Sequence, residues 1–176
     1  PLNSRSDTNI LAVVNPSTHQ ILLVSTPRDY YLTLPSKGQK DKLTHFGLYG
    51  IEESIKGLEQ LYNVDVDYYA RVHFAGLVGV IDALIQGIVN KAASPAILKS
   101  YQDVLSAASD SIATNMPKED IISLVKMQLQ DMSGWNITTY GLAGENSADY
   151  CYSLGNDTRY AVVLPNERMV ATAQDL

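Results

Sequence analysis

Two short apolar runs lie near the start of the chain. They cover Ile10 to Val14 and Ile21 to Val24, and the turn cluster Asn15-Pro16-Ser17-Thr18 separates them. Turn-forming residues between two runs of strand length are typical of a β-hairpin, and continuous apolar runs indicate buried strands. The pattern therefore predicts a buried antiparallel hairpin.

The segments that follow alternate between strand and helix patterns. Residues Tyr30 to Leu34 predict a short third strand, and a polar loop over 35–40 follows it. Val64 to Val72 alternates again and predicts a strand. Apolar residues at helical spacing predict two helices. The first ends near Asn63 and is formed around Leu48, Ile51, Ile55, Leu58 and Leu61. The second is marked by Phe74, Leu77, Val78 and Ile81. This order favours an α/β layered domain.

Proline and capping residues indicate where helices start in the second half of the chain. Helices are predicted to start at Ser94-Pro95 and at Pro117, because proline suits the first helical position. Strands are predicted over Trp135 to Leu142 and Arg159 to Leu164, with a loop rich in Gly, Asn, Ser and Asp between them. Asn166 is the expected N-cap of a last helix.

Composition narrows the possible classes of protein. With 176 residues, 45% hydrophobic and 18% charged, the chain suits one globular domain. A formal net charge of -6 argues against broad attraction to nucleic acid, so phosphate binding must rely on a few placed cations. Cys151 is the only cysteine, which excludes an internal disulfide and a cysteine-rich metal site. The chain contains no Gly-x-Ser-x-Gly, phosphate-binding glycine loop or His-Glu-x-x-His.

Four charged residues flank the first hairpin. Arg5 and Asp7 precede its first strand, and Arg28 and Asp29 follow its second. An antiparallel hairpin brings the start of one strand beside the end of the next, so these side chains are expected to meet at one edge of the sheet. Two interpretations remain open: solvated ion pairs, or arginines that bind phosphate beside a metal-binding aspartate.

Several motifs, taken in order, resemble the LytR-CpsA-Psr family. They are Arg5-Ser6-Asp7 before a strand, Thr26-Pro27-Arg28-Asp29 after the next, Asp41-Lys42-Leu43-Thr44-His45, Tyr68-Tyr69-Ala70-Arg71-Val72, Thr114-Asn115-Met116 and Leu124-Val125-Lys126-Met127-Gln128-Leu129. Each motif alone is weak, but their order and spacing are specific. The resemblance implies a single-domain α-β-α layered sandwich with a mixed central sheet over residues 1–176.

The resemblance also implies roles for the charged residues. Arg5 and Arg28 are expected to be catalytic and to bind a pyrophosphate, and Asp7 is expected to bind Mg²⁺ (or Mn²⁺) together with an aspartate upstream of Pro1. Arg71 either joins this pyrophosphate site or pairs with a carboxylate. Asp29 either orients Arg28 or is an ordinary turn acid. For Asp41, Lys42 and His45 no role follows, and His45 is expected to be a hydrogen-bonded structural residue.

Apolar helix positions allow two interpretations. Stripes at this spacing ordinarily form core. In the family, however, a cavity between sheet and helices holds a polyprenyl chain, which makes these residues a candidate lipid pocket: Phe74, Leu77, Ile81, Ile88 and Tyr101. Sequence alone does not separate a lined tunnel from a filled core.

The resemblance is interrupted between Leu84 and Ile85. Family members carry a segment with Arg-x-Arg and Arg-Gly-x-x-Gln at this point, whereas here the flanks abut. Either the protein lacks that segment, or the sequence joins two parts of a longer protein, and the good matches on both sides favour the second. The domain is accordingly expected to be truncated at its N-terminus as well, with a membrane anchor outside this chain.

The chain resembles the capsular polysaccharide assembly branch of the family, and this resemblance implies a magnesium-dependent phosphotransferase of cell wall assembly. It would move a glycopolymer, of the capsular polysaccharide or teichoic-acid type, from a polyprenyl pyrophosphate carrier to peptidoglycan at the extracellular face of the cytoplasmic membrane, with a possible side activity as a pyrophosphatase. The alternative is a module that binds polyprenyl phosphate without turnover. A DNA-binding regulator is disfavoured by the acidic charge balance.

Overall fold

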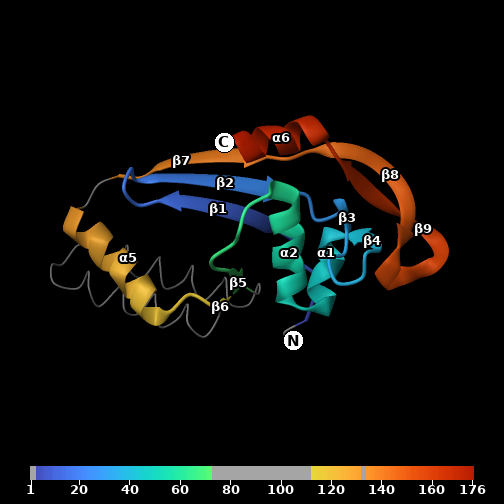
Figure 1. Cartoon of the computed structure of the whole chain (residues 1–176), viewed down its shortest axis with the longest axis horizontal. Coiled ribbons are helices and arrows are strands. Elements are labelled where there is room, and N and C mark those ends of the chain that lie inside the picture. The colour runs from blue at the N-terminus through green and yellow to red at the C-terminus, as the bar shows by residue number, and fades with distance from the viewer. Residues whose placement is uncertain (1–2, 73–111, 132–133) are drawn as a thin grey trace, which may run out of the picture. The chain divides into compact units, whose positions relative to one another are not determined.

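The computed structural model describes residues 3–72, 112–131 and 134–176, with the backbone alone at 125 and 128–131 (Figure 1). Two compact units can be distinguished. The first comprises Pro1–Val66 and Asp131–Leu176, and the second comprises Asp67–Gln130. Each unit is described by itself. The predicted helix at 74–81, the proline start at 94–95, the junction at 84–85 and the residues Phe74, Leu77, Ile81, Ile88 and Tyr101 lie outside the described residues.

A mixed three-stranded sheet forms the centre of the first unit. Its order is β1 (Asn9–Asn15), β2 (Gln20–Thr26) and β7 (Asn136–Gly141). β1 and β2 are antiparallel with Asn9 opposite Thr26, and β7 runs parallel to β2. The hairpin turn is held by the Asn15 side chain, whose Oδ1 accepts the N–H groups of Ser17 and Thr18. The predicted hairpin, turn and strand near Trp135 are confirmed, and so is the mixed α/β class with a mixed sheet.

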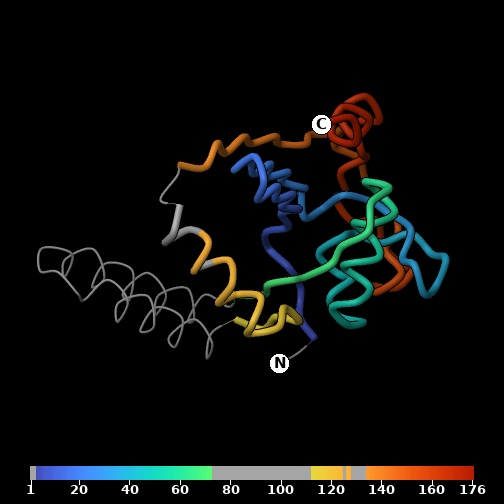
Figure 2. The backbone as a smooth tube through the Cα atoms, turned by 60° about the vertical axis from the view of Figure 1, so that its left-hand side comes forward, coloured from blue at the N-terminus to red at the C-terminus, as the bar shows by residue number. Residues whose placement is uncertain are grey.

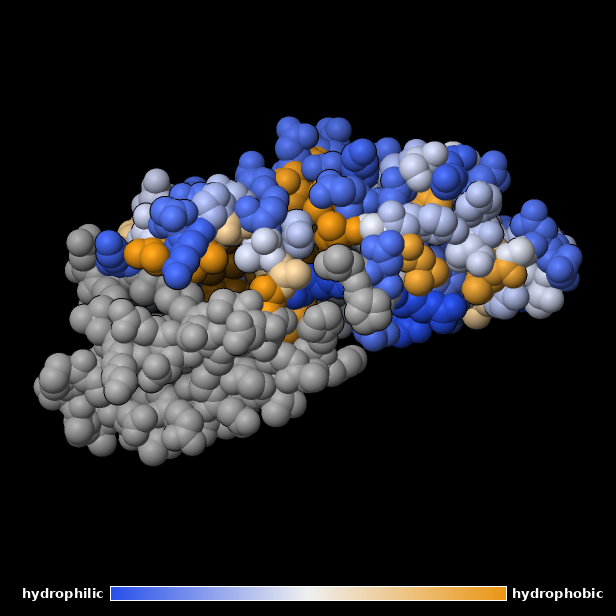
Figure 3. Space-filling model, turned by 90° about the horizontal axis from the view of Figure 1, so that it is seen from below, coloured by the Kyte–Doolittle hydropathy of each residue, from blue (hydrophilic) through white to orange (hydrophobic). Residues whose placement is uncertain are grey.

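The sequence predicted that β1 is buried, and this prediction is wrong for most of the strand. Ile10, Val13 and Val14 are 53%, 51% and 47% exposed. Burial is concentrated at the other end of the hairpin, where β2 carries the buried residues Val24 and Thr26. The buried residues Leu43, Phe46 and Tyr62 cluster with Val24, so Val13 and Val14, near the turn, lie beyond that cover. Ile10 lies opposite Ser25 at the covered end and is exposed all the same. Figure 3 shows one face of the molecule, on which hydrophobic patches lie between hydrophilic side chains.

Short elements after β2 build the rest of the first unit. β3 (Tyr31–Thr33) pairs antiparallel with β4 (Lys40–Lys42), which leads into α1 (Leu43–Phe46), the 3-10 turn η1 (Gly47–Tyr49) and α2 (Ile51–Tyr62). The third strand and the helix ending near Asn63 are confirmed. Asn63 adopts the left-handed conformation that closes helices, with a φ of 55°. The sequence pattern missed β4 and α1, because each is only three or four residues long.

A long hairpin occupies the region predicted to contain a loop. β8 (Gly144–Cys151) pairs with β9 (Gly155–Pro165) across the 3-10 turn η3 (Tyr152–Leu154). The strand near Arg159 is therefore confirmed, but the preceding loop is a strand. Gly, Asn, Ser and Asp have low strand propensity, yet pairing along β9 supplies the backbone hydrogen bonds that outweigh it. Figure 2 shows this hairpin beside the segment that carries β3, β4 and α1, and residues of β4 contact β8.

The last helix closes the core of the first unit. α6 (Glu167–Asp175) begins at the predicted cap, since Oδ1 of Asn166 accepts the Met169 N–H at 3.1 Å. It packs against α2. Burial raises the pKa of Tyr30 to about 12, and its hydroxyl donates to the Ala143 carbonyl at 2.7 Å. The core consists of Val24, Tyr30, Leu34, Leu43, Phe46, Tyr62, Leu142 and Ala173.

The second unit contains β5 (Ala70–Val72), β6 (Ile112–Thr114) and α5 (Lys118–Asp131). β5 and β6 are antiparallel. Helix α5 confirms the proline start at Pro117, whose carbonyl accepts the N–H groups of Asp120 and Ile121. The predicted strand from Val64 is wrong before Ala70, because its partner β6 is only three residues long and offers no further ladder.

Candidate functional site

The frame of the candidate site is a set of backbone hydrogen bonds around Thr44 in α1. This residue is buried, its Oγ1 donates to the Ser6 carbonyl at 2.6 Å, and its carbonyl accepts the Ser6 N–H at 3.1 Å. Its N–H donates to the Arg28 carbonyl at 2.8 Å. The segment before β1 and the segment after β2 are therefore fixed on either side of one residue. This explains how the ends of the hairpin come to lie together.

Three of the four charged side chains predicted to meet at this edge do so, namely those of Asp7, Arg28 and Asp29. Among the described residues, the Arg5 side chain forms no hydrogen bond or ion pair with them. Nη1 of Arg28 donates to Oδ1 of Asp7, and Nε of Arg28 lies 3.8 Å from Oδ2 of Asp29. Lys42 adds a cation that sequence reasoning left without a role, since its Nζ lies 3.2 Å from Oδ1 of Asp29. Asp29 thus contacts both Arg28 and Lys42, which supports the interpretation that it orients Arg28.

The network is polar but open to water. The side chains of Arg28, Asp7 and Asp29 are 47%, 54% and 36% exposed, whereas that of Lys42 is 15% exposed. Exposed ion pairs contribute only about 0–1 kcal/mol to stability, so these ion pairs add little to the stability of the fold. The planar guanidinium of Arg28 has further N–H groups besides the two that face carboxylates. These groups are suited to binding phosphate oxygens.

Arg5 occupies an exposed position one residue before Ser6. Within the described ranges its guanidinium has no hydrogen-bond or ion-pair partner, which leaves its donors available to an anion. Its location depends on η1, because the backbone of Ser4 lies against Gly47: a Cβ placed on Gly47 would clash with the Ser4 carbonyl oxygen. The close approach, and not the φ of -62°, demands glycine there.

Replacing Gly47 tests whether this contact positions Arg5. We expect Gly47→Ala to displace residues 4–6, because the clash is with backbone and no rotamer change relieves it. Since a shift of about 1 Å in a reacting group can cost about 100-fold in rate, an activity that uses Arg5 should fall at least about tenfold. Initial rates measure the loss. Gly141→Ala is the matched control, because its Cβ meets nothing within 4 Å; equal effects of the two changes would contradict the positioning role.

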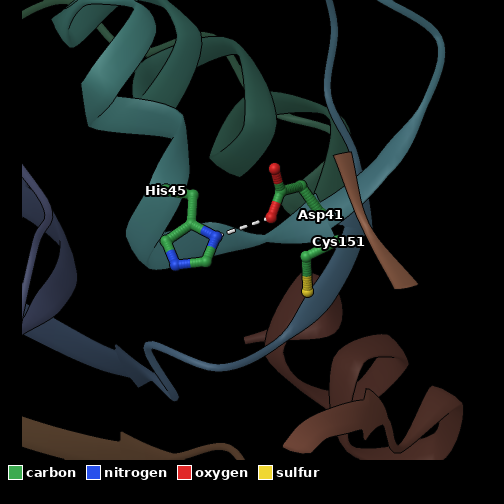
Figure 4. Close-up of side chains that lie close together, drawn as sticks. All are labelled: Asp41, His45 and Cys151. Atoms are coloured by element: carbon green, nitrogen blue, oxygen red, sulfur yellow. Dashed lines mark hydrogen bonds and ion pairs between the residues drawn. The ribbon is translucent and has the colours of Figure 1, made fainter. Parts of the chain in front are cut away.

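A hydrogen-bond cluster is formed by the buried residues Asp41 and His45, which Figure 4 shows, and the half-buried Ser153. Nδ1 of His45 lies 2.7 Å from Oδ1 of Asp41 and 2.8 Å from Oγ of Ser153. The carboxylate also accepts the N–H groups of Lys42 and Ser153, each at 2.8 Å. Burial alone raises the pKa of Asp41, but the hydrogen bonds from His45, Ser153 and Lys42 outweigh it and hold the pKa below its ordinary value.

This cluster does not form a catalytic triad. In a Ser-His-Asp triad the serine and the aspartate contact opposite ring nitrogens, so that the imidazole relays a proton. Here Ser153 and Asp41 both contact Nδ1 of His45. The cluster instead joins η3 to β4 and α1, and the prediction that His45 is a hydrogen-bonded structural residue is confirmed.

Cys151 completes a group with Asp41 and His45 whose ligand atoms lie within 4.8 Å of one another. Metal binding would require a thiolate, yet burial and then the charge of Asp41 raise the pKa of the Cys151 thiol. The Asp41 oxygens already accept hydrogen bonds, and Figure 4 shows the sulfur pointing away from the Asp41–His45 bond. These residues therefore fit a packed structural cluster better than a metal centre.

Other residues singled out from the sequence have different outcomes. Asp7 can offer Oδ2 to a cation, because in the described part of the chain only its Oδ1 is hydrogen-bonded. One available carboxylate oxygen fits Mg²⁺, which usually keeps several waters. Arg71 is half-buried in β5 of the second unit, and its pyrophosphate role stays a prediction. Sequence reasoning missed Thr44 and Ser153, neither of which has a motif that signals its contacts.

The model of the LytR_cpsA_psr family matches residues 2–88, which include the Arg5 segment, Arg28 and the Asp41–His45 stretch. The chain belongs to the LytR-CpsA-Psr family. The match ends in the region of the sequence where the family motifs abut.

Relatives of this family member include a polyisoprenyl-teichoic acid–peptidoglycan teichoic acid transferase TagU of Bacillus cereus. It is 31% identical over 131 residues, which cover 74% of this chain and 41% of TagU. A second TagU, of Enterococcus faecalis, is 26% identical, and 57% of its length is covered. The chain thus spans about half the length of the curated relatives it matches.

Solved structures share the fold. The protein gbs0355 of Streptococcus agalactiae has a TM-score of 0.75 at 18% identity, covering 99% of this chain and 79% of its own. TagT bound to LI-WTA has a TM-score of 0.71 at 19% identity and covers 97% and 83%. Within the described residues, no helix has the length and apolar character needed to cross a membrane.

Proposed function

We propose that this chain belongs to a phosphotransferase that moves a glycopolymer from a polyprenyl pyrophosphate carrier to peptidoglycan. The names of its relatives support a transfer of teichoic acid to peptidoglycan. The observation that carries the proposal is the Arg28 guanidinium, held between Asp7 and Asp29 on a frame that also holds the Arg5 segment. In this proposal the reaction takes place at the extracellular face of the cytoplasmic membrane, with an anchor outside this chain.

The chemistry requires stabilisation of negative charge. When an acceptor hydroxyl attacks the phosphorus that carries the glycan, the bond between that phosphorus and the bridging oxygen breaks and polyprenyl phosphate leaves. Arg5 and Arg28 neutralise charge on the diphosphate, and the carboxylates fix the plane of the Arg28 guanidinium. Asp7 would hold Mg²⁺ (or Mn²⁺) through its second oxygen, and that ion would supply further charge neutralisation.

A transfer assay tests the proposal. The protein, incubated with Mg²⁺, a radiolabelled polyprenyl-pyrophosphate glycan and purified peptidoglycan, is expected to give labelled peptidoglycan. Release of free phosphorylated glycan without acceptor labelling would reveal only the side pyrophosphatase activity. If the protein binds the lipid tightly but yields neither labelled peptidoglycan nor free phosphorylated glycan, it is a lipid-binding module and not a transferase.

A further inference from the structure

Two tyrosines from distant parts of the chain lie together on the surface of the first unit. Tyr49 is in η1 and Tyr152 is in η3, their ring centroids are 6.2 Å apart, and their planes are inclined by 37°. They are 37% and 44% exposed, so each keeps much of its surface open to solvent. We call them the tyrosine pair.

The frame that holds the charged cluster also holds the tyrosine pair. Tyr49 ends η1, whose first residue, Gly47, lies against the Ser4 backbone. Tyr152 precedes Ser153, which is bonded to Asp41 and His45. The five-residue step from Thr44 to Tyr49 through α1 and η1 spans roughly 10 Å. Because the Thr44 N–H binds the Arg28 carbonyl, the pair lies within reach of a ligand that occupies the cluster.

The chemistry of this surface suits an uncharged sugar. Tyrosine offers a rigid ring with an apolar face and a polar hydroxyl, which matches the C–H face and the hydroxyl groups of a pyranose. One carboxylate acts on the pair: burial raises the pKa of Tyr49, and the charge of Asp41 contributes next. The negative charge of Asp41 disfavours a phosphate-rich polymer at the pair but does not disfavour a neutral glycan.

We infer that the tyrosine pair binds a neutral sugar ring of the acceptor glycan and so presents its hydroxyl to the charged cluster. This inference rests on the proposed transferase function and assigns the acceptor side of the same site. The diphosphate then occupies Arg5 and Arg28, and the acceptor approaches over η1 and η3. Stacking on two rings positions the acceptor without using any of the phosphate-binding cations.

Binding of a soluble N-acetylglucosamine tetramer, measured by calorimetry without any lipid donor, tests the inference. The Tyr49→Ala/Tyr152→Ala variant is expected to bind at least about tenfold more weakly, and Tyr49→Phe/Tyr152→Phe should stay close to the unsubstituted protein because the ring faces remain. Tyr68→Ala is the matched control, since Tyr68 is 44% exposed and lies in the second unit. If the double alanine variant fails to fold, Tyr152→Ala alone gives the measurement.

The outcomes separate this inference from the proposed function. Transfer without tetramer binding, or equal affinities in all variants, would overturn the acceptor surface and leave the transferase intact. Tyrosine-dependent binding of the tetramer with no transfer would support the sugar surface and overturn the transferase. Binding of a glycerol-phosphate oligomer that depends on Tyr49 and Tyr152 would mean that the donor polymer occupies the pair, which contradicts the inference.

Discussion

Arg28→Ala is expected to reduce glycopolymer transfer by about 100- to 1000-fold and to lower the free energy of unfolding by less than about 1 kcal/mol. The rate effect is large because a positioned donor that stabilises transition-state charge is lost. The stability effect is small because the Arg28 and Asp7 side chains are about half exposed. Initial rates of acceptor labelling and urea unfolding of the same preparations measure the two quantities.

Two further variants sharpen this prediction. Arg28→Lys keeps the positive charge but not the planar fork that Asp7 and Asp29 orient, so it should recover only part of the rate. Arg168→Ala, an exposed arginine of α6, is the matched control and should change neither quantity. If transfer falls only in proportion to the folded fraction, Arg28 is a structural residue.

Asp41→Asn is expected to have the largest effect on stability, a loss of about 3 kcal/mol at pH 7. The change removes the charge from a fully buried acceptor of hydrogen bonds from His45, Ser153 and Lys42. It should therefore loosen η3 and β8 from β4 and α1. Urea unfolding monitored by circular dichroism measures the loss.

The stability lost in Asp41→Asn is expected to depend on pH. Because folding lowers the pKa of Asp41, its contribution is fully present above the ordinary carboxyl pKa of about 4 and is lost as the pH falls through the lower, folded value. The difference in stability between the unsubstituted protein and Asp41→Asn should hence shrink below about pH 4. Asp65→Asn, at an exposed position, is the control. A difference that stays constant down to pH 2 would contradict the assignment.

The sequence predicted those turns and helix ends that are determined by adjacent residues. The Asn15 turn, the helix closed by Asn63 and the Asn166 cap are each decided by a few adjacent residues, so the sequence was sufficient. The hairpin then implied that Asp7 and Arg28 meet, and they do. Their distance from each other in the sequence did not matter, because one turn determines the pairing.

Contacts between distant segments were not predictable in this way. Asp41 and Ser153 are 112 positions apart, and their hydrogen bond depends on how the β8–β9 hairpin docks on β4. The Gly, Asn and Ser content of β8 gave the opposite signal for secondary structure. Lys42 lacked a role for the same reason, since its contact with Asp29 arises from the β3–β4 pairing and α1.

Arg5 and Arg28 are proposed to bind one diphosphate together. A double-mutant cycle tests this proposal by comparing the affinity for a soluble short-chain polyprenyl diphosphate with Mg²⁺ in Arg5→Ala, Arg28→Ala and the double variant. If both guanidiniums hold the same group, the double variant should bind at least about fivefold more tightly than the product of the two single losses predicts. Losses that simply multiply would show two independent arginines and would contradict the claim.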